Sequence, residues 1–319
     1  MPEPLTTTNY DANNRQLTFG NKTLVYDDNG NLQSITDSNG TTLYSWNARN
    51  QLVGVNGPNV IASFAYDGAG RRQRRTINGS STEILYDRPN PVQELSGGTI
   101  LANLLTGLQV DEYFRRSDVA VGTTNDIIFD GLHSVIALTD PIGVVQTEYS
   151  YEPFGKSSFA GVSNTNPYQY TGRENDATVD LYYYRARYFH PTLQRFITED
   201  PLEFAGGDTN LYGYVLNNPV NIIDPTGEIF NWLNCLRCNS VADDIHRAEE
   251  ACKDELAKCT TPEQLLRFLD RYNGAWVSEA MFNCVKGKAA PDVWKKFMSD
   301  CFKCGILQPL PGPRVLPRR

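Results

Sequence analysis

The sequence predicts a mainly β fold, in which a curved or spiralling antiparallel sheet of β-hairpin repeats is followed by a small α-helical domain. Two observations predict the sheet. An aromatic residue followed by Asp or Asn recurs every 20 residues, and the 319-residue chain contains 17 Tyr and 14 Phe, side chains that suit the half-buried surface of a sheet. A third observation, the change in composition near residue 228, predicts the separate domain.

The repeat has the same frame in each copy. Its pairs are Tyr26-Asp27, Trp46-Asn47, Tyr66-Asp67 and Tyr86-Asp87, preceded by Tyr10-Asp11. Each pair ends an apolar strand and leads into a short polar turn, where the Asp side chain can cap the backbone and a Gly supplies a positive φ. Because one hairpin cannot bury its apolar face alone, we expect the copies to stack side by side.

This aromatic–Asp–x–x–Gly pattern, which begins at Tyr10, resembles the YD repeat of Rhs proteins, Tc-toxin C subunits and teneurins. The resemblance implies a β-shell that encloses a cargo polypeptide. The YD-repeat hairpins are expected over residues 1–128. Five copies are few for a closed shell, so we expect a partial YD shell whose sheet edges are exposed.

Residues 129–227 resemble the Rhs-associated core domain through an ordered series of motifs. The series is Tyr151-Glu152-Pro153-Phe154-Gly155, Tyr170-Thr171-Gly172-Arg173, Tyr182 to Tyr188, Asn217-Asn218-Pro219 and Asp224-Pro225-Thr226-Gly227. In the stretch from Tyr182 to Tyr188, large rings alternate with Arg185 and Arg187, and a strand would place them on opposite faces. The Asp-Pro-Thr-Gly sequence is typical of a turn.

In the family that this segment resembles, the core domain often cuts its own chain as an aspartyl protease. Two neighbouring carboxylates suit this chemistry, because like charges raise one pKa and let that group hold a proton while the other activates water. The resemblance implies Asp200 and Asp208 as the catalytic pair and Arg195 as a supporting charge. The alternative is that these aspartates only begin turns.

The resemblance also implies where the chain is cut. The family cuts just after Asp-Pro-x-Gly-Leu, so the expected bond is Glu228–Ile229, with Glu228 in place of the usual Leu. Asp224, Pro225 and Gly227 are expected to shape the turn before the cut. A carboxylate at the cut would repel an aspartyl pair, which keeps an uncut tail as an alternative.

A cysteine-rich helical domain is expected over residues 228–304, followed by a Pro-rich, disordered tail at 305–319. All seven cysteines lie between Cys235 and Cys304. Ile245, Ala248 and Leu256 fall at helical spacing. Two Cys-x-x-Cys pairs, Cys235/Cys238 and Cys301/Cys304, are candidate ligands of a structural zinc ion. Disulfides and free core thiols are the alternatives, and no other cofactor is expected.

Charge and hydropathy restrict the partners. The first 227 residues hold 15 basic and 25 acidic residues, a net charge of −10. The remainder holds 14 basic and 12 acidic residues, a net charge of +2, so the whole chain carries −8. An acidic shell excludes nucleic acid as its partner, because phosphate binding requires clustered positive charge. No apolar stretch is long enough to span a membrane, and no signal peptide is visible. We therefore expect that the protein is synthesised in the cytoplasm and that a specialised system secretes it or delivers it to the cell surface.

The leading hypothesis is the C-terminal portion of a polymorphic-toxin-type shell that encloses, presents or releases its own C-terminal domain as cargo. The remaining shell segments, a secretion-system component or an immunity protein are the other expected partners. Enzymatic activity would come from self-cleavage or from a toxic tail. The alternative is a non-enzymatic structural or cell-surface YD-repeat protein with an uncut tail.

Overall fold

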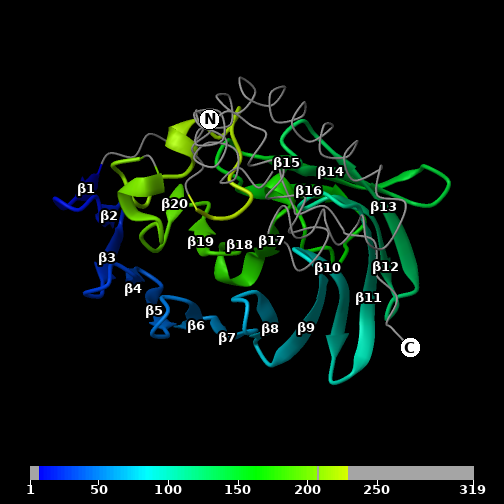
Figure 1. The fold of residues 1–319 in the computed structure, drawn as a ribbon, viewed down its shortest axis with the longest axis horizontal. Helices are drawn as coiled ribbons and strands as arrows, with labels where there is room; N and C mark the ends of the chain where they lie inside the picture. The colour runs from blue at the N-terminus through cyan, green and yellow to red at the C-terminus, as the bar shows by residue number, and fades with distance from the viewer. Residues whose placement is uncertain (1–6, 207, 229–319) are drawn as a thin grey trace, which may run out of the picture. The chain divides into compact units, whose positions relative to one another are not determined.

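The computed structural model describes residues 7–206 and 208–228. Within them the fold is mainly β, as predicted, with a 16-stranded sheet and a second, 4-stranded sheet, both antiparallel. The long sheet bends round the smaller one (Figure 1). The expected helical domain, all of its cysteines and the Pro-rich tail lie outside the described residues.

The strands of the long sheet pair in the order in which they occur in the sequence. They are β1 (Thr8–Tyr10), β2 (Gln16–Phe19), β3 (Lys22–Tyr26), β4 (Leu32–Asp37), β5 (Gly40–Trp46), β6 (Leu52–Gly57), β7 (Val60–Tyr66), β8 (Arg72–Ile77), β9 (Ser80–Asp87), β10 (Asn90–Ser96), β11 (Thr99–Thr106), β12 (Tyr113–Asp118), β13 (Thr123–Phe129), β14 (Val135–Thr139), β15 (Val145–Tyr151) and β16 (Ser157–Gly161). This order is that of consecutive hairpins, as the repeat predicts.

The smaller sheet and its short turns are built from residues that follow β16. Its strands are β17 (Glu174–Asp176), β18 (Leu181–Tyr184), β19 (Arg187–His190) and β20 (Arg195–Phe196), and the 3-10 turns are η1 (Tyr170–Gly172), η2 (Ala177–Val179), η3 (Glu203–Gly206) and η4 (Val215–Asn217). No helix in the described part of the chain is long and apolar enough to cross a membrane.

The turn that follows each repeated aromatic residue has a local cause. The Asp27 carboxylate accepts hydrogen bonds from the backbone N–H groups of Asn29 and Asn31, at 3.0 and 2.8 Å. Asn47 and Asp67 cap the next two turns through the same pair of positions. Because every one of these contacts lies within four residues, the sequence of the turn alone is enough to form it.

The aromatic residues occupy equivalent places on successive hairpins, which confirms the repeat. Trp46 donates to the carbonyl of Leu32, Tyr66 to that of Leu52 and Tyr86 to that of Arg72, at 2.8, 2.7 and 2.9 Å. The turn after Tyr86 differs from the others, because Asp87 pairs with Asn90 across a tight connection between β9 and β10. Asp87 is therefore part of the ladder, whereas the repeat predicted a cap.

The buried positions of the sheet follow the same 20-residue spacing, with one exception. Leu32 and Leu52 begin β4 and β6 and are fully buried, and the equivalent position at the start of β8 is Arg72, also fully buried. The Arg72 guanidinium forms ion pairs with Glu174 and Asp176 of β17. The long sheet is thus joined to the smaller sheet by buried charge at one strand and by apolar packing at its neighbours.

Residues 129–227 contribute to both sheets. The long sheet continues without a break across residue 128 and ends with β16, and the remainder forms the smaller sheet and its loops. Leu181, Tyr183, Tyr188 and Ile197 pack in one hydrophobic cluster with apolar side chains of the long sheet, including Phe64. The smaller sheet therefore fills the space that the hairpins curve around, and its β18–β19 turn contacts the end of the described chain.

Candidate active site

The turn between β18 and β19 binds the segment that ends the described chain. Three successive residues of this turn donate hydrogen bonds to three successive carbonyls. Arg185 Nη1 donates to Pro225, the Ala186 backbone N–H donates to Thr226 at 3.1 Å, and Arg187 Nε donates to Gly227. Because main-chain carbonyls accept all three, this clamp holds the backbone of residues 225–227 whatever their side chains.

Asp224 and Gly227 give the clamped segment its shape. The Asp224 Oδ1 atom accepts hydrogen bonds from the backbone N–H groups of Thr226, at 3.3 Å, and Gly227, at 2.9 Å. Gly227 has a φ of +71°, and a Cβ atom there would lie 1.9 Å from the carbonyl oxygen of Tyr184. The close approach to the β18–β19 turn therefore requires glycine. The expected role of Asp224, Pro225 and Gly227 in a turn agrees with this arrangement.

The turn also brings two carboxylates to one arginine. Arg187 Nη2 lies 2.9 Å from Asp200 Oδ2 and 3.4 Å from Asp224 Oδ2. Asp200 and Asp224 are each 1% exposed, and Arg187 is 2% exposed. The guanidinium carbon of Arg187 lies 3.6 Å from the centre of the Phe196 ring, which forms one wall of the site. Two acids that share one cation in a buried place are a candidate site for proton-transfer chemistry.

Burial and neighbouring charge act together on these groups. Burial and, to a smaller extent, the nearby charge of Asp200 raise the pKa of Asp224 to about 6, against the attraction of Arg187. Glu228 is half-buried, and its pKa is raised first by burial and then by Asp200, while Arg187 opposes both. Burial lowers the pKa of Arg187, opposed by the carboxylates of Asp224, Asp200 and Glu228. A guanidinium remains a cation at neutral pH all the same.

The structure differs from the expected catalytic set at two residues. Asp208 caps its own loop, where Oδ1 accepts a hydrogen bond from the Asn210 backbone N–H at 2.9 Å, and the partner of Asp200 at Arg187 is Asp224. Both Asp208 and Asp224 precede turn residues, so the sequence alone does not decide which of them shares Arg187 with Asp200.

Arg195 also lies elsewhere. It donates a hydrogen bond to the carbonyl of Asn14 at 3.0 Å, and its guanidinium stacks over the rings of Tyr10 and Tyr212. The arginine that contacts Asp200 at 2.9 Å is Arg187. The stretch from Tyr182 to Tyr188, predicted as one strand, is instead a hairpin, in which β18 ends at Tyr184, Arg185 lies in the turn with a φ of +58° and Arg187 begins β19.

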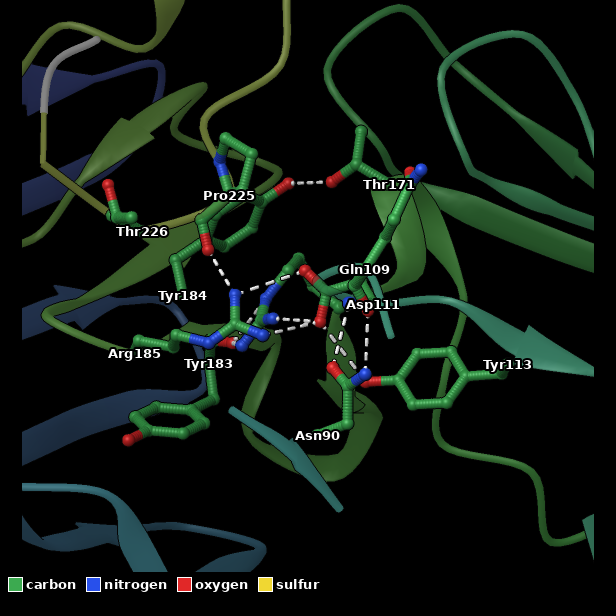
Figure 2. A network of polar contacts seen from close by, with 12 residues as sticks. Asn90, Gln109, Asp111, Tyr113, Thr171, Tyr183, Tyr184, Arg185, Pro225 and Thr226 are labelled. Carbon is green, nitrogen blue, oxygen red and sulfur yellow. Dashed lines mark hydrogen bonds and ion pairs between the residues drawn. The ribbon is translucent and has the colours of Figure 1, made fainter. Parts of the chain in front are cut away.

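A second buried network adjoins the clamp. Its arginines, Arg173 and Arg185, lie in the motifs of the core segment, but no motif pointed to Asp111. Asp111 lies between β11 and β12 and accepts hydrogen bonds from Arg173 at 2.6 Å and from Arg185 at 2.7 and 3.0 Å (Figure 2). Burial, which opposes ionisation of Asp111, is outweighed by the two arginines, so its pKa lies below the usual value. Arg185 thus connects the long sheet to the carbonyl of Pro225.

The predicted ligands of a structural zinc ion, Cys235, Cys238, Cys301 and Cys304, lie outside the described residues. Among the residues that are described, no group of three or more His, Cys, Asp or Glu side chains is arranged to hold a metal ion.

Three curated relatives resemble this chain. The chain is 30% identical to the tRNA3(Ser)-specific nuclease WapA of Bacillus spizizenii over 68% of its own length and 10% of that protein. It is 30% identical to the toxin subunit YenC2 of Yersinia entomophaga, over 57% of this chain and 21% of that one. The third is the double-stranded DNA deaminase toxin A of Burkholderia cenocepacia, at 25% identity over 68% and 18% of the two chains.

This chain therefore spans about a tenth to a fifth of the length of these relatives. It is also similar to the crystal structure of TcdB2-TccC3, with 21% identity and a TM-score of 0.48 over 65% of this chain and 13% of that one.

The family model described as the teneurin YD-shell matches residues 3–220, which is more than half of the chain. The match covers the hairpin repeats, the smaller sheet and Asp200, and it ends just before the clamped segment at 224–227. Together with the equivalent aromatic positions on successive hairpins, it shows that this chain is an Rhs-type YD-shell protein and belongs to the teneurin YD-shell family.

Proposed function

We propose that this chain is the C-terminal portion of a toxin shell, which presents its C-terminal domain and releases it by aspartyl self-cleavage beside Glu228. One observation carries the proposal. Asp200 and Asp224 share Arg187, and the segment that Arg187 clamps leads directly to the expected bond. The names of the relatives, a nuclease and two toxin components, support a shell whose cargo is toxic.

Asp224 and Asp200 are assigned the acid and base roles of the reaction. Asp224 holds a proton at mildly acidic pH, because its pKa is raised to about 6 by burial. Asp200 takes a proton from water as the water oxygen bonds to the carbonyl carbon, and Asp224 gives its proton to the carbonyl oxygen. The resulting diol then collapses. The carbon–nitrogen bond breaks, the leaving nitrogen takes the proton from Asp200, and Asp224 recovers its own from a hydroxyl.

Arg187 is assigned two tasks in this scheme. It keeps the two carboxylates beside each other, where they would otherwise repel, and it fixes the Gly227 carbonyl next to Glu228. The clamp contacts only the backbone of residues 225–227, so the cut would be specified by the position of this segment on the fold and not by the side chains of these three residues.

Mass spectrometry of the purified full chain tests this function. We expect two fragments that separate at or next to Glu228, and a single intact chain for Asp200→Asn and for Asp224→Asn. Asp208→Asn is the matched control, because Asp208 caps a neighbouring loop without a contact to Arg187 in the described structure, and it should cut like the wild type. An intact wild-type chain at every pH from mildly acidic to neutral would contradict the proposed cleavage.

An uncut shell is the second candidate, and Glu228 favours it. Its carboxylate is half-buried near Asp200 and Arg187, where it adds a third negative charge to the site. A wild-type chain that stays intact, together with a Glu228→Leu chain that is cut, would identify a shell whose cleavage is blocked by this residue.

A secretion-system component and an immunity protein are the partners of the proposed toxin shell. Toxicity of residues 229–319, expressed alone in bacteria, tests the cargo separately.

A further inference from the structure

A loop of the long sheet contacts the clamp at Arg185. Asp111 lies between β11 and β12 and is 3% exposed. Its backbone N–H donates to Asn90 Oδ1 at 2.9 Å, and its Oδ1 atom accepts from the Tyr113 hydroxyl at 3.1 Å. The first contact holds the backbone of Asp111, and the second orients its carboxylate. The long sheet therefore holds this acceptor in place independently of the two arginines.

Two arginines of the smaller sheet converge on this one carboxylate. Arg173 donates to Asp111 at 2.6 Å and also to the Tyr183 carbonyl, at 3.0 and 2.8 Å, which satisfies its donors within the interior. Arg185 donates to both Asp111 oxygens and, from the same Nη1 atom, to the Pro225 carbonyl (Figure 2). Asp111 therefore determines where the Arg185 guanidinium lies, and Arg185 determines where Pro225 lies.

Removal of the Asp111 charge would leave two guanidinium groups facing each other in a buried place. Like charges at this range repel strongly when they are shielded from water. Arg173 is 3% exposed and tied to the Tyr183 carbonyl, whereas the Arg185 side chain is 20% exposed. Arg185 is thus the one that can move outward, and it would take its hydrogen bond away from Pro225.

We propose that Asp111 is a positioning residue for Asp224, acting through Arg185 and the Pro225 carbonyl. This inference rests on the proposed self-cleavage, because it assigns the shell a part in assembling that site. Asp224 follows the clamp because it is bonded directly to Pro225, and its carboxylate also caps Thr226 and Gly227. The hairpin sheet would then be required for the geometry of the cut as well as for enclosure.

Amide hydrogen exchange tests the positioning directly and needs no cleavage. In an uncut Asp200→Asn background, we expect Asp111→Asn to speed exchange at Thr226 and Gly227 by about tenfold or more, the effect of losing one buried hydrogen bond. Asp118→Asn is the matched control, since Asp118 is also buried and pairs with Arg116 away from the clamp. Equal exchange at Thr226 and Gly227 in both variants would overturn the proposal.

Arg185→Gln is a second variant, for the case in which Asp111→Asn does not fold. It leaves the Asp111–Arg173 pair in place and removes only the link to Pro225. We expect the same loss of protection at Thr226 and Gly227. If Asp111 acts through Arg185, the double variant should exchange no faster than either single variant, and additive effects would contradict this route.

The rate of cleavage and its pH dependence supply a further test. The titratable groups that face Asp224 are Arg187, Asp200 and Tyr214, and Glu228 interacts with Asp200 and Arg187. Asp111→Asn and Arg185→Gln should each cut at least tenfold more slowly than the wild type. The pH above which cleavage slows should also be lower in both variants, because a solvated Asp224 loses its proton at lower pH, and a general loss of stability would not cause this shift. If the wild type cuts and both variants cut at the same rate and with the same pH dependence, the positioning role is wrong. An uncut wild type with the expected exchange would instead retain it and reject the proposed cleavage.

Discussion

Arg72 of β8 donates a hydrogen bond to Asp176 of β17 from the other sheet, across 104 residues of sequence, and both side chains are fully buried. Arg72 occupies the place that leucine holds in the two preceding hairpins. Its guanidinium also lies over the ring of Tyr183, 4.5 Å from the ring centre. The repeat is therefore broken at the strand where the smaller sheet presents its acidic residues.

Arg72→Leu would restore the repeat and leave Glu174 and Asp176 buried beside fewer cations. We expect a loss of about 3–5 kcal/mol in the free energy of unfolding, because a buried carboxylate without its partner is strongly destabilising. Arg71→Ala is the control, since Arg71 pairs with Asp67 at a side-chain exposure of 39% and should cost under about 1 kcal/mol. Urea unfolding measures both, and similar losses would contradict the role given to Arg72.

Gly227→Ala should release the clamped segment. The new Cβ atom would overlap the Tyr184 carbonyl, in addition to the cost of a positive φ. Gly143→Ala separates the two effects, because Gly143 has a φ of +88° and open space around its Cβ position. We expect Gly143→Ala to cost about 1 kcal/mol and to cut normally. Gly227→Ala should abolish the fragment that begins after the cut, and a normal rate of cutting would show that the clamp is not needed.

Glu228→Gln should speed cleavage at neutral pH. The substitution removes a carboxylate that competes with Asp200 and Asp224 for Arg187 while it keeps the size of the side chain. Since the pKa of Glu228 is raised, the wild-type side chain loses its charge as the pH falls through that raised value, and the two chains should converge at acidic pH. Timed gels follow the fragments, and Glu152→Gln, at an exposed position, is the control. A rate advantage that persists at acidic pH would contradict this explanation.

Asp224 should make stability fall as the pH rises. Its pKa is about 6 in the folded protein against an ordinary value of 3.8. The folded state thus holds this proton more tightly. The contribution is fully present below the ordinary pKa and is lost as the pH rises through about 6. As the pH rises from about 4 to about 7, the free energy of unfolding of Asp224→Asn should increase by on the order of 3 kcal/mol relative to that of the wild type. Chemical denaturation measures this difference, and a constant offset between the two chains would contradict it.

Much of the long sheet was predictable because its signals are local. The Asp27, Asn47 and Asp67 turns close through contacts within four residues, so the sequence of each turn is sufficient to predict it. The constant spacing then predicts that Trp46 and Tyr66 lie at equivalent places. The Asp87 turn shows the limit of this reasoning, because the pair is retained there while the residues that follow build a different connection.

The sequence by itself determined the hairpin repeat and the Rhs-type motifs. The tertiary structure alone decided that Asp200 and Asp224 share Arg187 and that Asp111 pairs with Arg185. The reason is the range of the interactions. A turn is stabilised by atoms a few residues apart, whereas buried charges are brought together by chain segments whose spacing in the sequence says nothing of their distance in space.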